Sequence, residues 1–77
     1  MEYFVYILRC SDDSYYVGST NNLERRVSEH NAGTAAQWTS HRKPVSLVYS
    51  EKQKDLLGAR KREMQIKHWS RIKKEML

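Results

Sequence analysis

The chain has little cysteine, proline and glycine, and no long apolar run. Its one cysteine, Cys10, rules out an intrachain disulfide and a zinc site made of several cysteines. No apolar run approaches the ~20 residues that cross a bilayer, and the N-terminus lacks a signal-peptide pattern. We therefore expect a soluble, cytoplasmic protein. Because repeats, linkers and low-complexity stretches are missing too, we expect one domain over residues 1–77.

Charge is the most informative part of the composition. Fourteen Lys and Arg residues against nine Asp and Glu give a formal net charge of +5, and the excess is densest between Lys52 and Lys74. A basic surface attracts polyanions and favours nucleic acid through the release of counterions. Many small intracellular domains are basic for no such reason, so the charge is compatible with nucleic-acid binding without establishing it.

The first third of the sequence predicts a β-hairpin. Residues 3–10 are apolar except for Arg9 and rich in β-forming types, which is typical of a buried strand. A turn cluster follows at residues 11–14, and residues 15–19 form the second predicted strand.

Loop length decides whether the hairpin tyrosines Tyr6 and Tyr16 lie on one face, because side chains alternate along a strand. A three-residue loop over residues 11–13 would pair Leu8 with Tyr16. It would also pair Tyr6 with Gly18, which would leave space beside the Tyr6 ring. A two-residue loop would put the two tyrosines on opposite faces.

A helix is predicted after the hairpin. Asn21, followed three residues later by Glu24, resembles a capping box, and Gly33 is a natural stop. Leu23 and Val27 form the predicted buried stripe of this helix.

Two side chains of this helix are candidates for chemistry. Arg26 and His30 are four residues apart, so they share a helical face that flanks the stripe. They could equally form a solvated helix edge, as Arg25 and Glu29 are expected to do. Residues 34–42 are left open between a short helix and an ordered loop anchored by Trp38.

The rest of the chain predicts a third strand and two helices. Pro44 forces an extended entry to a strand over residues 45–49. A long helix covers residues 55–69, and Ser70 caps a short terminal helix. The predicted fold is α+β, a small three-stranded antiparallel β-sheet flanked by helices in the order ββααβαα. The long helix is expected to bury Leu56, Leu57, Ala59, Met64 and Ile66.

Glu63 falls within the apolar arc of the long helix, almost directly above Leu56. A carboxylate there could serve a site on the inner surface. It could also pair with Arg60 or Lys67 at helical spacing, which is a common surface arrangement.

Several short motifs in order resemble the GIY-YIG nuclease domain. They are VYI at residues 5–7, YVG at residues 16–18, and then LERR and EH in the first helix. The later stretches RKPVSLVY and ARKREMQIKHWSR resemble the small stand-alone bacterial members, which consist of this domain alone. The excinuclease C subunit carries a similar domain fused to others. Val5 stands where the name motif has glycine, and the late asparagine of some homing-type members has no counterpart.

This resemblance implies cleavage of phosphodiester bonds with Mg²⁺ or Mn²⁺ as cofactor. By position, the implied catalytic residues are Tyr6, Tyr16, Arg26 and His30, the metal-binding residue is Glu63, and the motif glycine is Gly18. The two tyrosines could instead be ordinary residues of an amphipathic sheet.

Each implied residue type suits the chemistry. Tyr6 is the candidate base for an attacking water, provided that nearby cations or metal lower its usual pKa of ~10. Tyr16 would orient the water, and Arg26 would offer a planar fork of donors to the phosphate. Glu63 would hold one hydrated Mg²⁺. His30 would assist proton transfer or contact phosphate, and the sequence leaves that choice open.

The leading functional hypothesis is a metal-dependent DNA endonuclease or nicking phosphodiesterase, with a role in repair or recombination. We expect a monomer that acts on branched, damaged or non-specific DNA, because so small a domain has little surface for reading a long sequence. The alternatives are a non-catalytic nucleic-acid-binding module and a protein-interaction domain. The cations expected to contact nucleic acid are Arg25, Arg42, Lys43, Arg60 and Lys67.

Overall fold

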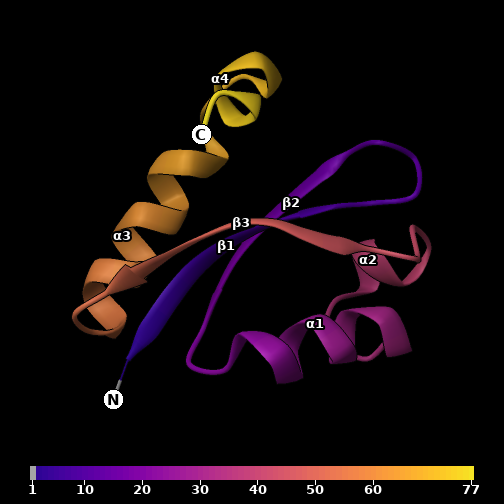
Figure 1. Cartoon of the computed structure of the whole chain (residues 1–77), viewed down its shortest axis with the longest axis horizontal. Coiled ribbons are helices and arrows are strands. Elements are labelled where there is room, and N and C mark those ends of the chain that lie inside the picture. Colours follow the sequence, from indigo (N-terminus) through magenta and orange to yellow (C-terminus); the bar gives the residue numbers. More distant parts are fainter. Residues whose placement is uncertain (1) are drawn as a thin grey trace.

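Three strands lie at the centre of the computed structural model, which describes residues 2–77 (Figure 1). The strands form one antiparallel sheet in the order β2-β1-β3, so β1 is central and β2 and β3 are edges. The predicted α+β class and the order ββααβαα are confirmed. The elements are β1 (Tyr3–Arg9), β2 (Tyr15–Thr20), α1 (Leu23–Ala32), α2 (Gln37–Ser40), β3 (Ser46–Gln53), α3 (Leu56–Lys67) and α4 (Arg71–Glu75).

Helices cover both faces of this sheet. Side chains alternate along β1, so the strand contributes apolar residues to a buried cluster on each face. On one face Val5 and Ile7 form a buried cluster with Ala59 and Ile66 of α3. On the other face the cluster contains Tyr6, Leu8, Cys10 and Val45, and Leu23 and Val27 of α1 pack against it. Figure 1 shows α3 and the pair α1 and α2 on opposite sides of the strands.

The hairpin has the register that a three-residue loop predicts. Tyr6 pairs with Gly18, and Leu8 pairs with Tyr16. The loop is closed by a hydrogen bond of 2.8 Å from the Cys10 amide to the Ser14 carbonyl. Tyr6 and Tyr16 therefore lie on the same face of the sheet.

Helix α1 begins one residue later than its predicted cap implies. The side chain of Asn22, rather than Asn21, accepts the Arg25 amide at 3.0 Å. Gly33 ends the helix in the left-handed region with φ of 83°, as predicted. In the last turn of the helix, the Asn31 side chain accepts the Val45 amide at 2.8 Å and donates to the Val45 carbonyl at 3.1 Å, which ties α1 to the start of β3.

The segment that the sequence left open forms the short helix α2. Trp38 on this helix contacts Tyr16, with ring centroids 6.0 Å apart. The guanidinium of Arg42 lies 4.0 Å from the centroid of the Trp38 ring. Trp38 thus anchors the segment, although its side chain stays 40% exposed.

Strand β3 extends four residues beyond its predicted end at Tyr49. Its second half is polar, so the hydrophobic pattern does not show it, yet Glu51 and Lys52 pair with β1. An edge strand tolerates such residues because one side faces solvent. Glu51 also pairs with Arg62 of α3 at 2.8 Å, which fixes the strand end against that helix.

The predicted inner face of α3 is wrong for three residues. Ala59 and Ile66 are fully buried, whereas Leu56, Leu57 and Met64 are 44%, 65% and 64% exposed. Leu57 and Met64 are seven residues apart and share the side opposite Ala59. Further along, Ser70 caps α4 as predicted, accepting the Lys73 amide at 3.3 Å.

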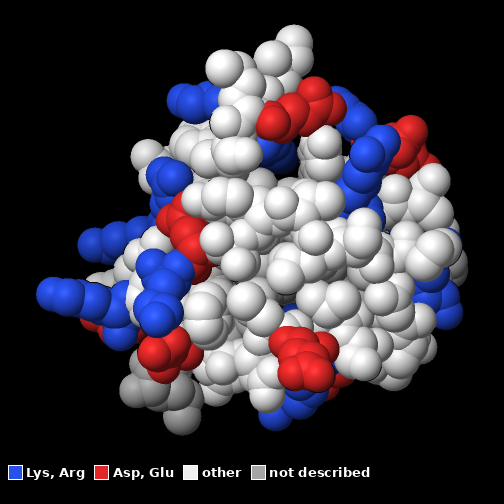
Figure 2. All heavy atoms as spheres, viewed as in Figure 1, with Lys and Arg blue, Asp and Glu red and all other residues white. Residues whose placement is uncertain are grey.

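Lysine and arginine side chains gather along the side of the molecule that carries α3, as Figure 2 shows, and the middle of that view is uncharged. Within residues 2–77, no helix is both long enough and apolar enough to cross a bilayer.

Candidate active site

A chain of hydrogen bonds runs through the buried side chains of Tyr6, His30 and Thr39. The Tyr6 hydroxyl lies 2.9 Å from Nε2 of His30, and Nδ1 of that ring lies 2.8 Å from Oγ1 of Thr39. The Thr39 hydroxyl donates to the carbonyl of Ala36 at 3.1 Å, so its oxygen accepts from the imidazole. This places the ring proton of neutral His30 on Nδ1 and makes Nε2 the acceptor of the Tyr6 proton.

Burial sets the protonation of this pair. It lowers the pKa of His30, and the nearby charge of Arg26 acts in the same direction. Burial also raises the pKa of Tyr6 to about 12, which the Arg26 guanidinium only partly offsets. The base role predicted for Tyr6 required a lowered phenol pKa. The shift has the opposite sign, and the phenol instead contacts a proton acceptor, Nε2 of His30.

Tyr16 and Gly18 form the wall of β2 beside Tyr6. The Tyr16 ring centroid lies 6.5 Å from that of Tyr6 and 4.9 Å from that of His30. A Cβ atom at Gly18 would lie 2.5 Å from the Tyr6 hydroxyl oxygen and 2.6 Å from its Cζ. Glycine therefore makes the room that the Tyr6 ring occupies, as the hairpin register implied.

Arg26 carries an unpaired donor in this region. Its Nη1 lies 3.3 Å from Oε1 of Glu29, in a pair that is partly exposed. Its Nε is buried and has no hydrogen-bond partner of good geometry within residues 2–77, although the neighbouring Tyr6 hydroxyl raises the pKa of Arg26. A buried guanidinium N–H without an acceptor costs free energy, and an anionic oxygen would satisfy it. His30 is fully buried and Arg26 is partly exposed, so the two side chains do not share one solvated helix edge.

Glu63 reaches the same region from α3, on the other face of the sheet. Its Oε1 accepts the Ser19 hydroxyl at 2.6 Å, and its Oε2 lies 2.7 Å from the Lys67 ammonium. The Glu63 side chain is only 19% exposed. Of the two ion pairs that helical spacing allows, the structure contains the one with Lys67.

One cavity of about 170 Å³ joins these side chains. Because α1 and α3 cover opposite faces of the sheet, their residues meet around its free edge at β2. His30 does not line this cavity and lies behind Tyr6, to which it is hydrogen-bonded. The lining residues are Tyr6, Tyr16, Gly18, Ser19, Arg26, Arg60 and Glu63.

The donor set fits a hydrated divalent cation held by one carboxylate. Within residues 2–77 no three His, Cys, Asp or Glu side chains are grouped closely enough to hold a metal together. Mg²⁺ keeps several waters and takes one or two carboxylates together with phosphate oxygens, so Glu63 in a polar cavity suits it. The Lys67 ammonium has to leave that carboxylate first, and its side chain is 50% exposed and able to turn away.

The other cations predicted to contact nucleic acid have different surroundings. Arg60 lines the cavity, and Lys67 flanks it through Glu63. Arg25 and Lys43 are exposed and lie outside the cavity. Arg42 is held by an ion pair and by a backbone carbonyl, so its guanidinium already has partners.

Two residues of the site were missed by the sequence argument. Thr39 orients His30, and Ser19 orients Glu63. Neither belongs to a motif used in the sequence argument, and each lies on a different element from the side chain that it orients. Only the packing of α2 on α1, and of α3 on β2, brings them into place.

A three-stranded sheet between two helical layers, with phenols, a guanidinium and a carboxylate around one edge cavity, defines a small α+β domain with a polar site at one edge. Residues 2–75 match the family described as the GIY-YIG catalytic domain. The chain belongs to the GIY-YIG family, whose members are nuclease domains that generally depend on divalent metal and act on DNA.

Similar proteins are small chains of nearly the same length. A UPF0213 protein of Natronomonas pharaonis is 47% identical over 99% of this chain and 89% of its own. A UPF0213 protein of Syntrophus aciditrophicus is 49% identical over 96% of this chain and 86% of its own. The solution NMR structure of a UPF0213 protein from Bacillus halodurans has a TM-score of 0.61 and 39% identity, and the match covers 99% of this chain and 81% of that one. These names state no activity.

Proposed function

We propose that the chain is a metal-dependent DNA endonuclease that nicks phosphodiester bonds in the edge cavity, with branched or damaged DNA as its substrate and DNA repair or recombination as its setting. The observation that supports this most is the convergence of Tyr6, Arg26 and Glu63 on one cavity from three separate elements. Phosphoryl transfer needs positioning and charge stabilisation, and this set offers donors and a carboxylate for both.

Tyr6 and His30 act together in this proposal. A phenol with a pKa of about 12 keeps its proton at neutral pH and is by itself a poor base. Nε2 of His30 can take the phenol proton as the Tyr6 oxygen takes one from the attacking water. Thr39 holds the imidazole in the tautomer that this transfer requires. His30 thus assists proton transfer and has no contact with the phosphate.

Arg26 and Glu63 serve the phosphate. The unpaired Nε of Arg26 supplies a charged donor for a phosphate oxygen. Glu63 would hold Mg²⁺ or Mn²⁺, which neutralises charge that builds on the phosphate in the transition state. Tyr16, whose ring lies beside His30, orients the water. Arg60 provides a further cation on the cavity wall.

Nicking of supercoiled plasmid and of branched DNA in Mg²⁺ or Mn²⁺ tests the proposal. We expect Arg26→Ala and Glu63→Gln each to lower the single-turnover rate by about 10²-fold or more, since each removes charge stabilisation of the transition state. Glu24→Gln, which changes an exposed carboxylate of α1, is the matched control and should retain the rate.

The ion pair between Glu63 and Lys67 favours one alternative, a binding module in which the Glu63 carboxylate stays paired with Lys67 and holds no metal. Salt-sensitive DNA binding without nicking in any variant would establish that alternative. Nicking that persists equally in both site variants would place the activity elsewhere. Absence of both binding and nicking across the substrates would favour a protein-interaction domain.

A further inference from the structure

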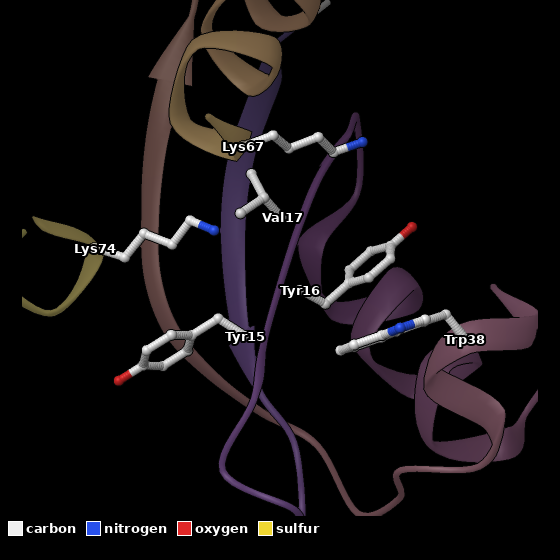
Figure 3. Close-up of a pocket in the computed structure, with 6 residues that line it drawn as sticks. All are labelled: Tyr15, Tyr16, Val17, Trp38, Lys67 and Lys74. Atoms are coloured by element: carbon white, nitrogen blue, oxygen red, sulfur yellow. The ribbon is translucent and has the colours of Figure 1, made fainter. Parts of the chain in front are cut away.

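We propose that a second cavity, next to the catalytic one, binds a single unpaired nucleotide beside the scissile phosphate. This nucleotide groove is defined by Tyr15, Tyr16, Val17, Trp38, Lys67 and Lys74 (Figure 3). The proposal rests on the proposed nuclease function and names the form of its substrate, a strand with at least one base outside the duplex.

The nucleotide groove has an aromatic wall held in place by its neighbours. The rings of Tyr16 and Trp38 lie 6.0 Å apart at an interplanar angle of 29°, and Figure 3 shows them side by side. The guanidinium of Arg42 lies 4.0 Å from the Trp38 ring and is itself bonded to Asp12 and to the Trp38 carbonyl. Because these contacts fix the wall beforehand, a ligand loses little free energy in ordering it.

The same groove is lined by two lysines, of which Lys67 has an ion pair and Lys74 has none. Lys74 is half-buried, and its ammonium has no ion pair or hydrogen bond recorded within residues 2–77. Figure 3 shows this side chain on the same side of β2 as Tyr15, with the Tyr16 and Trp38 rings on the other side of the strand. Lys67 enters from α3, where its one ion pair is the partly exposed contact with Glu63. Lys74 can therefore meet an anionic group directly, whereas Lys67 would first have to leave Glu63.

A ligand that matches both features has a flat apolar ring and a negative charge. A free phosphate would leave the aromatic wall uncovered, and an apolar peptide would leave the ammonium groups unmatched. A nucleotide supplies the ring for stacking and the phosphate for the lysines. The cavity of about 260 Å³ is smaller than the ~300–1,000 Å³ typical of drug-sized sites, so it suits one base rather than several.

Continuity with the catalytic cavity places this nucleotide next to the cut. Tyr16 lines both cavities, and Lys67 joins them through its contact with Glu63. A base inside a duplex is stacked on both faces and paired along one edge, so it has to leave the helix before it can enter a protein groove. The substrate is therefore a flap, a gap or a single strand rather than intact duplex.

Binding in EDTA tests this groove separately from cleavage. In a Trp69→Phe background Trp38 is the remaining tryptophan, so its fluorescence reports on the groove alone. We expect a single-stranded octathymidine to quench it, and the duplex of the same length to do so far less. By fluorescence anisotropy of a labelled octathymidine, Trp38→Leu should weaken binding about five- to 100-fold. Lys74→Gln should weaken it about threefold and lower the salt slope by about 0.7.

Lys61→Gln, which removes an exposed lysine of α3 outside the groove, is the matched control for charge. An octamer of abasic sites separates phosphate from base, and it should fail to distinguish wild type from Trp38→Leu. Equal affinities for duplex and single strand, or equal effects of the Lys74 and Lys61 variants, would overturn the proposal. If the groove binds as expected and no DNA is nicked in Mg²⁺, the subsite remains and the proposed nuclease function is wrong.

Discussion

At the scale of single residues, the site depends on how tightly Tyr6 is enclosed. Gly18 makes room for its ring, His30 accepts its proton, and Thr39 holds the imidazole. Each contact is buried, so each leaves little freedom for the phenol to move. Gly18 is thus needed because a side chain would collide with Tyr6, since its φ is not in the left-handed region.

Gly18→Ala should destabilise the fold by about 1–3 kcal/mol, because the new methyl would overlap the buried Tyr6 hydroxyl and ring. Urea unfolding monitored by circular dichroism measures this change. Gly58→Ala is the matched control: its Cβ would meet a side-chain oxygen of Asp55 at 3.1 Å, at an exposed helix start where that side chain can shift. Equal losses in the two variants would show that Tyr6 is able to move aside.

The Tyr6–His30 pair also predicts how stability depends on pH. Burial lowers the pKa of His30, so protonation favours the unfolded chain, and its contribution is complete above about pH 6.5 and lost as pH falls. Tyr6 behaves in the opposite sense: its pKa is raised to about 12, so stability falls as pH rises from the ordinary phenol value towards that point. The free energy of unfolding should therefore be highest between these limits.

Urea titrations at about pH 5.5 and 7.5 test this fall in stability at acid pH, called here the acid limb. The free energy of unfolding is expected to fall by up to about 1.4 kcal/mol per pH unit below 6.5. His30→Gln should flatten that limb. His68→Gln, which changes an exposed histidine, should leave it as in wild type. A limb that survives His30→Gln would assign the pH dependence to another group.

At the scale of elements, α3 delivers Glu63 to a cavity that the other helical layer also lines. The stripe of Ala59, Glu63 and Ile66 faces the sheet, and the carboxylate reaches the β2 edge beside Ser19. One turn later, Lys67 covers the same carboxylate. The helix therefore carries both the proposed metal ligand and a cation that competes with the metal.

Lys67→Met should raise the affinity for Mn²⁺ about two- to tenfold, because a competing charge leaves the Glu63 carboxylate. Isothermal titration calorimetry without DNA measures it. Lys61→Met, an exposed lysine of the same helix, should change the affinity far less. If binding is instead weakened by Lys67→Met, the lysine is part of the ion's surroundings and does not compete with it.

At the scale of the whole molecule, residues of the two helical layers meet around the β2 edge of the sheet. This arrangement puts the edge cavity around Tyr6, Arg26 and Glu63 next to the proposed nucleotide groove along β2. The cations that border them are Arg26, Arg60, Lys67 and Lys74. The larger collection of Lys and Arg along α3 in Figure 2 adds a general attraction for polyanions.

The salt dependence of single-strand binding separates these two contributions. If the bordering cations carry the contact, log Kobs should fall with log salt at a slope of about −3, at about 0.7 per cation, between about 50 and 200 mM. Anisotropy of a labelled single strand in EDTA measures the slope. A slope steeper than about −6 would show that binding spreads over the outer basic residues as well.

Local rules explain what could be predicted. The hairpin register follows from loop length and the alternation of side chains, which together place Tyr6 opposite Gly18. Capping rules found the C-terminal end of α1 at Gly33 and the start of α4 at Ser70. They missed the N-terminal cap of α1, which is Asn22, by one residue. Where the hydrophobic pattern is mixed, as in α3 and the polar end of β3, local rules failed.

The sequence by itself determined that the chain has a hairpin and a third strand, because these depend on neighbours within a few residues or across one short loop. It left the loop length open, so the shared face of Tyr6 and Tyr16 was decided by the structure. Tertiary packing alone decided the buried side of α3, the contact of His30 with Thr39, and the approach of Glu63 to Arg26 around β2. Glu63 and Arg26 lie far apart in the chain, and His30 and Thr39, nine residues apart, lie on two separate helices. The free energy of such contacts depends on how whole elements pack.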